Sequence, residues 1–361
     1  MAKKVIMAMS GGVDSSVAAY LLKEKGYDVT GVIMQIWQDT DRCDIENRGG
    51  CCGFSAVDDA RKVSAKLDIP FYVLNFRDKF KDTVIDYFVN EYLMGRTPNP
   101  CIACNRYVKW EALLDKSLSL GADYIATGHY ADVIKLENGR YTLRRDPNNP
   151  KDQTYALYNL TQFQLEHTLM PLTGIQKDEV RKIAGSLGLV TANKPDSQEI
   201  CFIPDNDYGR FIEDHIQNSA VPGNFIDEDG NILGRHKGII YYTVGQRKGL
   251  GVAFGKPMFV KYINPEKNEI VLCKKDGVFF KSFTASHVNY MAYCDFNTID
   301  CYVKIRYSHR PAECTLVKEE NGISCVFKEP QRAVTPGQSA VFYDVDNNII
   351  CGGAIVEGEG I

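Results

Sequence analysis

The stretch KVIMAMSGGVDSSVAAYLLKEKG, residues 4–26, decides the fold of this chain. Its first six residues form a mostly apolar run that ends at Ser10-Gly11-Gly12, and apolar residues then recur at helical spacing up to Gly26. The pattern predicts a strand, a glycine-rich turn and a helix. Backbone N–H groups and the helix dipole would point at that turn, which is therefore suited to bind an anion.

Strand and helix patterns continue to alternate after this unit. Strands are predicted over residues 29–34, 71–76 and 122–129, and helices over residues 55–67, 80–93 and 108–120. Such alternation is typical of a parallel sheet with helices on both faces, which binds ligands at the carboxyl ends of its strands. The sequence therefore predicts an α/β fold whose N-terminal domain is a Rossmann-like parallel sheet.

The pattern changes after residue 129. A hairpin is predicted about Asn138-Gly139, a helix near residues 178–187, and short strands with glycine turns over residues 234–273. From residue 283 most segments alternate with period two, and Asn321-Gly322 marks another hairpin, which predicts a small β-barrel or sandwich. We expect an α/β domain over residues 1–205, a small central domain over residues 206–280 and a C-terminal β-barrel over residues 281–361.

The composition narrows the class of protein. The 361 residues are 44% apolar, enough for two or three domains with their own cores, and the net charge is -4. A nucleic-acid partner would therefore be met by a local basic patch. The opening residues match neither a signal peptide nor a membrane span, so we expect a cytoplasmic protein without a membrane partner, whose 12 cysteines are mostly reduced core residues.

The glycine turn carries groups suited to a nucleotide. Glycines let the backbone approach phosphates, the serines add hydroxyl donors, and Asp14 is a candidate ligand for an Mg²⁺ ion that bridges the phosphates. For a lone Ser-Gly-Gly the alternative is an ordinary turn before a capped helix. The full SGGVDSS over residues 10–16 resembles the PP-loop ATP pyrophosphatases, which split ATP to AMP and pyrophosphate while adenylating a carbonyl oxygen. It differs from the P-loop motif G-x-x-x-x-G-K-[ST], which disfavours transfer of the γ-phosphate.

This resemblance implies an ATP site at the carboxyl edge of the sheet. Met34 and Gly128 end two predicted strands, where they would flank the adenine, although on pattern alone each is equally a core or turn residue. The predicted ATP-binding residues are Ala8, Met9, Ser10, Gly11, Gly12, Val13, Asp14, Ser15, Met34 and Gly128.

Three cysteines form a candidate catalytic set. Cys101 and Cys104 come just before the predicted helix, which begins near Tyr107. A helix N-terminus lowers the pKa of a thiol and makes it a better nucleophile. Cys201 lies in an apolar segment, where a buried structural cysteine is the alternative.

Six motifs that follow one another along the chain identify a family. They are TPNPxxxCN over residues 97–105, ATGHYA over 126–131, KDQTYAL over 151–157, ICFIP over 200–204, TVGQRKGLG over 243–251 and PGQSAVFY over 336–343. Together they resemble the bacterial tRNA-specific 2-thiouridylases, and the resemblance covers essentially the whole chain.

The resemblance implies ATP-dependent thiolation at C2 of the wobble uridine in tRNAs for lysine, glutamate and glutamine. ATP adenylates O2 of the base, and a cysteine persulfide then displaces AMP. Cys201 matches the cysteine that carries the persulfide, and Cys104 matches the partner nucleophile that can form a disulfide with it. The implied partners are tRNA and a sulfur donor, either a cysteine desulfurase or a persulfide carrier.

The sequence departs from some members of this family at Cys101, where an aspartate is the proposed acid–base group. Cys101 is a candidate auxiliary catalytic residue, spare sulfur acceptor, metal ligand or structural residue. The residues that the resemblance places near RNA are Asn99, Pro100, Cys101, His129, Lys151, Asp152, Gln153, Arg306, Tyr307 and Gln338. They would recognise a flipped uridine by stacking and by hydrogen bonds to its edge.

Three alternatives stay open on the sequence. The three candidate catalytic cysteines could hold an iron–sulfur cluster that supplies the sulfur. Cys43, Cys51 and Cys52 could bind zinc in a non-catalytic RNA-binding module. An amide-forming PP-loop ligase would use ATP with an amine acceptor and would not need Cys201.

Overall fold

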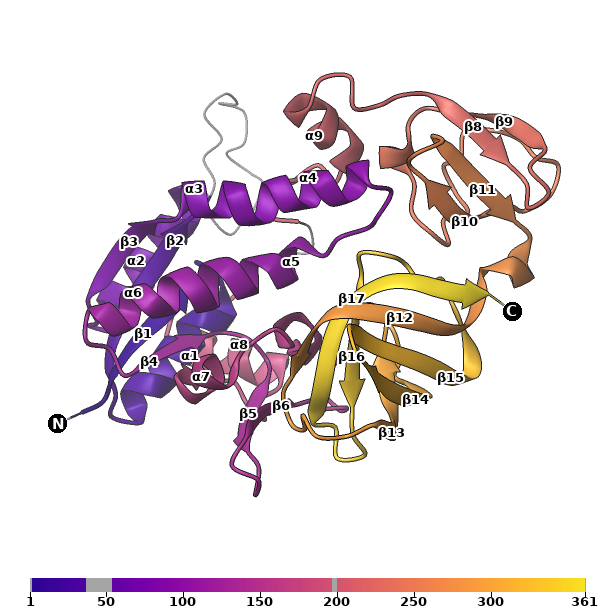
Figure 1. Cartoon of the computed structure of the whole chain (residues 1–361). Helices are drawn as coiled ribbons and strands as arrows, with labels where there is room; N and C mark the ends of the chain where they lie inside the picture. The colour runs from indigo at the N-terminus through magenta and orange to yellow at the C-terminus, as the bar shows by residue number, and fades with distance from the viewer. Residues whose placement is uncertain (1, 37–53, 197–199, 361) are drawn as a thin grey trace. The chain divides into compact units, whose positions relative to one another are not determined.

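The structure is a computed structural model that describes residues 2–36, 54–196 and 200–360 (Figure 1). The chain divides into two compact units, which are described separately below. The first unit contains residues 1–85 and 101–206, and the second contains residues 86–100 and 207–361. The chain therefore re-enters the first unit between Pro100 and Cys101. The domain boundaries expected near residues 205 and 280 stay predictions.

The first unit is built on a parallel five-stranded sheet with the order β3-β2-β1-β4-β7. Its strands are β1 (Lys4–Met9), β2 (Asp28–Gln35), β3 (Phe71–Asn75), β4 (Tyr124–Thr127) and β7 (Thr168–Leu169). Met9 pairs with Ile33 and Ala8 pairs with Thr127, so the carboxyl ends of the three central strands meet at one edge. The predicted α/β fold is confirmed, with β7 as an addition that the sequence pattern did not predict.

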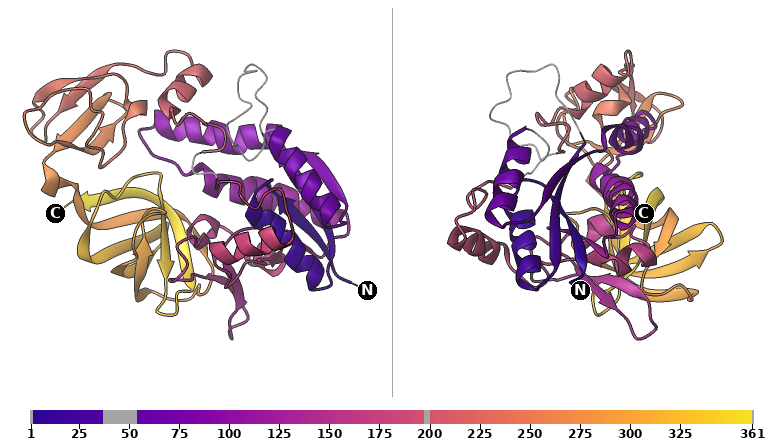
Figure 2. Two further views of the ribbon diagram at one scale, coloured as in Figure 1. Left: turned by 180° about the vertical axis from the view of Figure 1, so that it is seen from behind. Right: turned by 90° about the vertical axis from the view of Figure 1, so that its left-hand side faces the viewer.

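Helices lie on both faces of this sheet (Figure 2). They are α1 (Val13–Glu24), α2 (Phe54–Lys66), α3 (Arg77–Phe80), α6 (Leu114–Ser119), α7 (Gln162–Glu166) and α8 (Lys177–Ser186), with the π-helices η1 (Lys81–Ile85) and η2 (Cys104–Leu113) and the 3-10 helix η3 (Thr154–Leu157). Val5, Met7 and Val29 from the strands share one core with apolar residues of α1, α2 and α8. The strands β1, β2 and β4 are mostly buried, and they read as largely apolar runs because helices cover both faces of the sheet, whereas the edge strand β3 is largely exposed.

The helix predicted over residues 108–120 begins earlier than expected. α5 (Pro100–Ala103) runs directly into η2 and then α6. Proline is favoured in the first turn of a helix because its fixed φ suits the helix and its missing N–H needs no partner there. Cys101 and Cys104 therefore lie inside the first turns of the helix, and the prediction that they precede it is wrong.

The hairpin predicted about Asn138-Gly139 is confirmed. β5 (Asp132–Lys135) pairs with the antiparallel β6 (Tyr141–Arg144), and Gly139 has a φ of +81°. An L side chain rarely adopts that conformation, which explains the glycine at the turn.

The second unit contains a small sheet and two helices. The sheet has the order β10-β11-β8-β9, with β8 (Gly223–Ile226), β9 (Ile232–His236), β10 (Phe259–Asn264) and β11 (Glu269–Cys273). The helices α4 (Asp86–Leu93) and α9 (Tyr208–His215) pack through the rings of Tyr92 and Tyr208, whose centroids are 5.1 Å apart. Two 3-10 helices, η4 (Ile239–Tyr241) and η5 (Lys275–Val278), complete this part.

The second unit also contains a closed barrel with the order β12-β15-β14-β13-β16-β17. Its strands are β12 (Phe279–Tyr290), β13 (Thr298–Lys304), β14 (Ala312–Glu319), β15 (Gly322–Arg332), β16 (Ser339–Tyr343) and β17 (Ile349–Gly360). Because the six strands close on themselves, this part of the chain is a β-barrel and not a sandwich, the two alternatives that the sequence left open. The barrel core includes four buried cysteines, Cys301, Cys314, Cys325 and Cys351. The expectation that most of the 12 cysteines fill cores stays a prediction, because three of them lie outside the described residues.

Within the described ranges, the structure contains no helix with the length and apolar character needed to cross a membrane.

Candidate functional site

The nucleotide loop, defined as residues 10–16, connects β1 to α1 and is held by its own hydroxyl groups. Ser15 Oγ accepts a hydrogen bond from Ser10 N at 3.1 Å, and Ser16 Oγ donates to the Gly12 carbonyl at 2.8 Å. Gly12 occupies the N-cap position of α1 and brings no side chain to it. The first N–H groups of the helix therefore face a position where a phosphate could bind.

Two glycines at this site are required by close approach of the backbone. Gly11 has a φ of +67°, and a Cβ there would lie 2.5 Å from the Ala56 carbonyl oxygen. Gly128 follows β4, and a Cβ there would lie 2.7 Å from Ser15 N and 2.9 Å from the Asp14 carbonyl carbon. The nucleotide loop thus rests directly on the residue that follows β4.

The predicted ATP-binding residues come together at the carboxyl edge of the sheet. Ala8 and Met9 end β1, the nucleotide loop follows them, and Gly128 follows β4. Met34 lies near the end of β2, paired with Leu74 of β3, and is largely buried. The arrangement matches the place where open α/β sheets bind nucleotides, and the individual contacts to ATP stay predictions.

Asp14 of the nucleotide loop is engaged by two side chains that the sequence reading did not select. Lys177 Nζ lies 2.8 Å from Asp14 Oδ1 and 2.7 Å from Oδ2, and Tyr130 Oη donates to Oδ1 at 2.6 Å. Burial and the bond to Asp14 raise the pKa of Tyr130, which keeps its proton. Mg²⁺ is commonly held by one or two carboxylates together with nucleotide phosphates, so Asp14 suits this ion.

The chain after α8 folds back onto the nucleotide loop. Thr191 Oγ1 donates to Ser16 Oγ at 3.1 Å, and Lys194 Nζ donates to the Gly11 carbonyl at 3.0 Å. This is the part of the chain that leads to Cys201. The nucleotide loop and the approach to that cysteine therefore share one hydrogen-bonded network.

Asp196 is the centre of a charge cluster beside the loop. Lys151 and Lys177 each approach its carboxylate to 2.7 Å, and Arg181 approaches to 3.2 Å. Burial acts to raise the pKa of Asp196, but hydrogen bonds from Lys151 and Lys177 outweigh it and lower the pKa to about 2. With Asp14 included, three cations face two carboxylates, and this excess of positive charge favours an anionic ligand.

The three candidate catalytic thiols lie in the first unit. Cys101 and Cys201 are exposed, and Cys104 is partly buried. Phe202 follows Cys201 and is buried, with its ring 5.7 Å from that of Phe80 in an edge-on contact. The Cys201 segment is thus anchored by its apolar neighbour, while Cys201 itself is exposed.

His129 lies directly after Gly128 and is held as a neutral group. Its Nδ1 shares a hydrogen bond of 2.8 Å with Thr127 Oγ1, and its ring lies 5.7 Å from that of Trp110. Burial, and secondarily the charge of Lys109, lower the pKa of His129 well below its usual value. With Nδ1 bonded to Thr127, the neutral imidazole keeps Nε2 as an uncharged hydrogen-bonding group, which suits contact with an uncharged base.

The predicted RNA-contacting segment at residues 151–153 has defined partners in the first unit. Lys151 is paired with Asp196, Asp152 accepts from Thr154 Oγ1 at 2.7 Å, and Gln153 Oε1 accepts from Tyr130 N at 3.1 Å. These bonds fix the shape of the segment. Whether it also contacts RNA stays a prediction.

The predicted RNA contacts are divided between the units. Asn99, Pro100, Arg306, Tyr307 and Gln338 belong to the second unit, and Cys101, His129, Lys151, Asp152 and Gln153 belong to the first. Arg306 donates to the Arg332 carbonyl at 3.1 Å, and the Tyr307 side chain is 44% exposed. Gln338 donates through Nε2 to the Thr97 carbonyl at 2.8 Å, so its amide is engaged within the protein.

The described residues contain no group of three His, Cys, Asp or Glu side chains arranged to hold a metal ion. Cys101, Cys104 and Cys201 are all described, and they do not form a ready ligand set for an iron–sulfur cluster. The zinc alternative cannot be followed in the structure, because Cys43, Cys51 and Cys52 lie outside the described residues.

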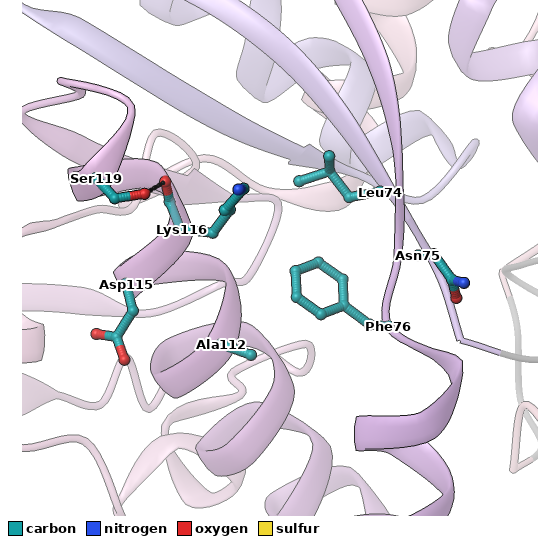
Figure 3. Close-up of a pocket in the computed structure, with 7 residues that line it drawn as sticks. All are labelled: Leu74, Asn75, Phe76, Ala112, Asp115, Lys116 and Ser119. Atoms are coloured by element: carbon teal, nitrogen blue, oxygen red, sulfur yellow. Dashed lines mark hydrogen bonds between the residues drawn. The ribbon is translucent and has the colours of Figure 1, made fainter.

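A pocket of about 470 Å³ lies elsewhere in the first unit, between the end of β3 and the η2–α6 helix (Figure 3). It is lined by Leu74, Asn75, Phe76, Ala112, Asp115, Lys116 and Ser119. None of these is a predicted site residue, and Ser119 uses its hydroxyl locally on the Lys116 carbonyl at 2.7 Å. The pocket therefore adds nothing to the candidate site.

The sequence reading missed the side chains that surround the nucleotide loop from α8 and the chain after it. Lys177, Arg181, Lys194 and Asp196 lie more than a hundred residues from the glycine turn in sequence, and they carry no local motif that links them to it. Tyr130 offered a signal, because it belongs to the ATGHYA motif. The other four lie on α8 or in the chain after it, and only the tertiary structure shows that they lie beside the nucleotide loop.

Three family models match consecutive parts of the chain. Residues 3–205 match the tRNA methyl transferase HUP domain, residues 209–274 match the tRNA methyl transferase PRC-barrel domain, and residues 280–356 match the aminomethyltransferase beta-barrel domain.

Named relatives match the chain from end to end. The tRNA-specific 2-thiouridylase MnmA of Lachnoclostridium phytofermentans is 60% identical, and the match covers 98% of this chain and 100% of that protein. The tRNA-specific 2-thiouridylase MnmA of Clostridium perfringens is 57% identical, with 98% of each chain covered. Among solved structures, NMN synthetase from Francisella tularensis is 17% identical with a TM-score of 0.34, over 54% of this chain and 66% of that one, a likeness too low to carry an argument.

Proposed function

Because the chain belongs to the tRNA-specific 2-thiouridylase family, we propose that it replaces O2 of the wobble uridine with sulfur in tRNAs for lysine, glutamate and glutamine. ATP is the activating substrate, and AMP and pyrophosphate are released. A cytoplasmic location, and a cysteine desulfurase or persulfide carrier as the sulfur donor, are parts of this proposal.

The observation that carries the chemistry is the attachment of the chain that leads to Cys201 to the nucleotide loop. Thr191 and Lys194 bond to the loop, and Asp196 shares Lys177 with Asp14. Cys201 follows Asp196 by five positions, and an extended chain of that length spans at most roughly 18 Å. A base adenylated at the loop would therefore lie within reach of a sulfur carried by Cys201.

In the proposed reaction the O2 oxygen of the uridine attacks the α-phosphate of ATP, and pyrophosphate leaves. The first N–H groups of α1 and the cations around Asp196 hold the phosphates, and Asp14 would hold Mg²⁺, which neutralises phosphate charge. Adenylation makes O2 a good leaving group. Positioning and electrostatic stabilisation are the main contributions of the protein to this step.

Sulfur transfer then uses the two thiols. The terminal sulfur of a persulfide on Cys201 bonds to C2, and AMP leaves with the oxygen. Cys104 attacks Sγ of Cys201, the S–S bond breaks, and its electron pair stays on the sulfur that is now part of the tRNA. The two cysteines are left as a disulfide, which an external reductant resets. Cys101 is a candidate auxiliary residue, and His129, Lys151, Asp152, Gln153, Asn99, Pro100, Arg306 and Tyr307 are candidate RNA contacts.

The test is thiolation of an unmodified glutamate tRNA transcript with ATP, Mg²⁺, a cysteine desulfurase and cysteine. Product is measured by mercury-gel shift and nucleoside mass spectrometry. We expect 2-thiouridine from the wild type and none from Cys201→Ser or Cys104→Ser. Cys294→Ser is the matched control, because Cys294 is an exposed cysteine of the barrel unit outside the proposed site, and it should retain full activity.

Two other results would redirect the assignment. Loss of activity on removal of iron, with absorbance near the visible–ultraviolet boundary, would favour the iron–sulfur alternative over the persulfide. Cleavage of ATP to AMP with an amine acceptor and without tRNA, unaffected by Cys201→Ser, would favour an amide-forming ligase.

A further inference from the structure

The turn between β15 and β16, residues 335–338, is built against Thr97. The Pro336 carbonyl accepts from Thr97 N at 2.9 Å, and Gln338 Nε2 donates to the Thr97 carbonyl at 2.8 Å. Both backbone polar groups of one residue are therefore bound by one turn. All of these residues belong to the second unit.

The shape of this turn allows no side chain at its centre. Gly337 has a φ of +87°, and a Cβ there would lie 2.9 Å from Thr97 N and 3.0 Å from Arg96 Cβ. Two backbone hydrogen bonds also fix this turn to β17: Gly337 N donates to the Ile355 carbonyl at 3.0 Å, and Ile355 N donates to the Gln338 carbonyl at 2.8 Å. A rigid barrel strand therefore holds the turn, and the turn holds Thr97.

Thr97 is also fixed from a third direction. Its hydroxyl donates to Thr243 Oγ1 at 3.1 Å, and Thr243 N donates to Gln246 Oε1 at 3.0 Å. Two motifs far apart in sequence, TVGQRKGLG and PGQSAVFY, thus converge on a single residue of the TPNPxxxCN motif.

Thr97 is connected to the thiols by a stiff piece of chain. Pro98 and Pro100 have fixed φ angles, and a proline also restricts the residue before it to extended backbone. Pro100 starts α5, and Cys101 is the next residue. A displacement of Thr97 would therefore be passed along this short stretch toward Cys101.

We propose that Gln338 is a positioning residue for sulfur transfer, which acts through Thr97 on the placement of the catalytic thiols. This inference rests on the proposed function. The sequence reading gave Gln338 a different role, direct contact with RNA. The two roles lead to different kinetic results, because a lost RNA contact weakens tRNA binding, whereas a lost positioning bond slows the chemistry of bound tRNA.

The test compares Gln338→Ala with the wild type in two measurements. In single-turnover thiolation with tRNA in excess of its Kd, we expect the rate constant to fall by roughly tenfold to a hundredfold, because small displacements of reacting groups have large effects on rate. The Kd for tRNA, measured by fluorescence anisotropy without ATP, should change by less than about twofold, within the scatter of surface substitutions.

The second measurement is amide hydrogen exchange of the free protein over residues 96–104. Exchange should become faster by roughly tenfold in Gln338→Ala, since one of the bonds that hold Thr97 is lost. This readout does not depend on thiolation, so it tests the positioning role even if the proposed function fails. Absence of 2-thiouridine with the wild-type enzyme would instead refute the proposed function.

Two further variants complete the design. Gln331→Ala is the matched control, because Gln331 is a barrel glutamine whose amide bonds the Glu329 carbonyl at 2.8 Å and His309 Nε2 at 3.1 Å rather than Thr97, and it should leave exchange and rate unchanged. Thr243→Val removes the third bond to Thr97 and should act in the same direction as Gln338→Ala, which keeps the proposal testable if Gln338→Ala folds poorly. An increase in the Kd for tRNA with unchanged exchange and unchanged rate constant would overturn the proposal.

Discussion

Replacement of Gly128 by alanine should damage the nucleotide site, because the added methyl group would collide with the backbone of the nucleotide loop. The added Cβ would lie 2.7 Å from Ser15 N, about 0.7 Å inside the 3.4 Å at which ordinary contact begins. It would also lie 2.9 Å from the Asp14 carbonyl carbon and 3.0 Å from Ser15 Cα. All three atoms are backbone, so the first turn of α1 must move as a body.

The expected magnitude follows from that displacement. A shift of most of an ångström at a catalytic group costs on the order of a hundredfold in rate, so AMP formation should fall by about that factor. Overpacking of this kind costs about 1–3 kcal/mol of stability. The variant should therefore remain folded at 25 °C while it loses most of its adenylation activity.

The assay measures tRNA-dependent AMP release and the free energy of unfolding in urea. Gly185→Ala is the matched control, because Gly185 lies exposed on α8 with open space around its Cβ position. Alanine there should stabilise the protein by about 0.4–1 kcal/mol and leave AMP release unchanged. If Gly128→Ala released AMP at the wild-type rate, the argument that the nucleotide loop rests on Gly128 would be refuted.

Three further predictions concern the same unit. Lys177→Met removes the cation shared by Asp14 and Asp196, and it should weaken ATP binding by roughly tenfold in calorimetric titration with Mg²⁺; an unchanged Kd would contradict a phosphate-binding role. Trp110→Phe removes the buried 2.7 Å bond to Thr168 Oγ1 and leaves a small cavity, so urea unfolding should report a loss of about 1–3 kcal/mol; a loss below 0.5 kcal/mol, the scale of ordinary surface substitutions, would be inconsistent with this. Burial lowers the pKa of His129, so the unfolded chain binds a proton at this residue more readily than the folded protein does. The free energy of unfolding should therefore decline as the pH falls below about 6.5, by up to about 1.4 kcal/mol per pH unit from this residue. His129→Gln should show a smaller decline.

Much of the fold could be predicted because its signals are local. The apolar run before Ser10-Gly11-Gly12 and the helical spacing after it describe adjacent residues, and adjacent residues decide whether a strand or a helix forms. The hairpin at Asn138-Gly139 is confirmed for the same reason, since a turn depends on the φ angles of two neighbouring residues.

Errors arose where local signals were weak or short. The apolar pattern of the helix that carries the thiols is clear only after Tyr107, and the four residues Pro100–Ala103 were too few to reveal a helical period. β7 has only two residues and pairs with β4, so no pattern could mark it. The sequence also left a barrel and a sandwich open, because alternation with period two is common to both.

The sequence by itself determined the α/β class, the nucleotide loop, the family and the identity of the candidate thiols, because these depend on residues that are neighbours along the chain or on motifs that are continuous. Only the tertiary structure decided which side chains surround those motifs. Lys177 meets Asp14 across 163 positions, and Gln338 meets Thr97 across 241. Such contacts form when α8 packs on α1 and when the barrel closes beside residues 96–97, and packing of distant elements leaves no signal in the local pattern of a single sequence.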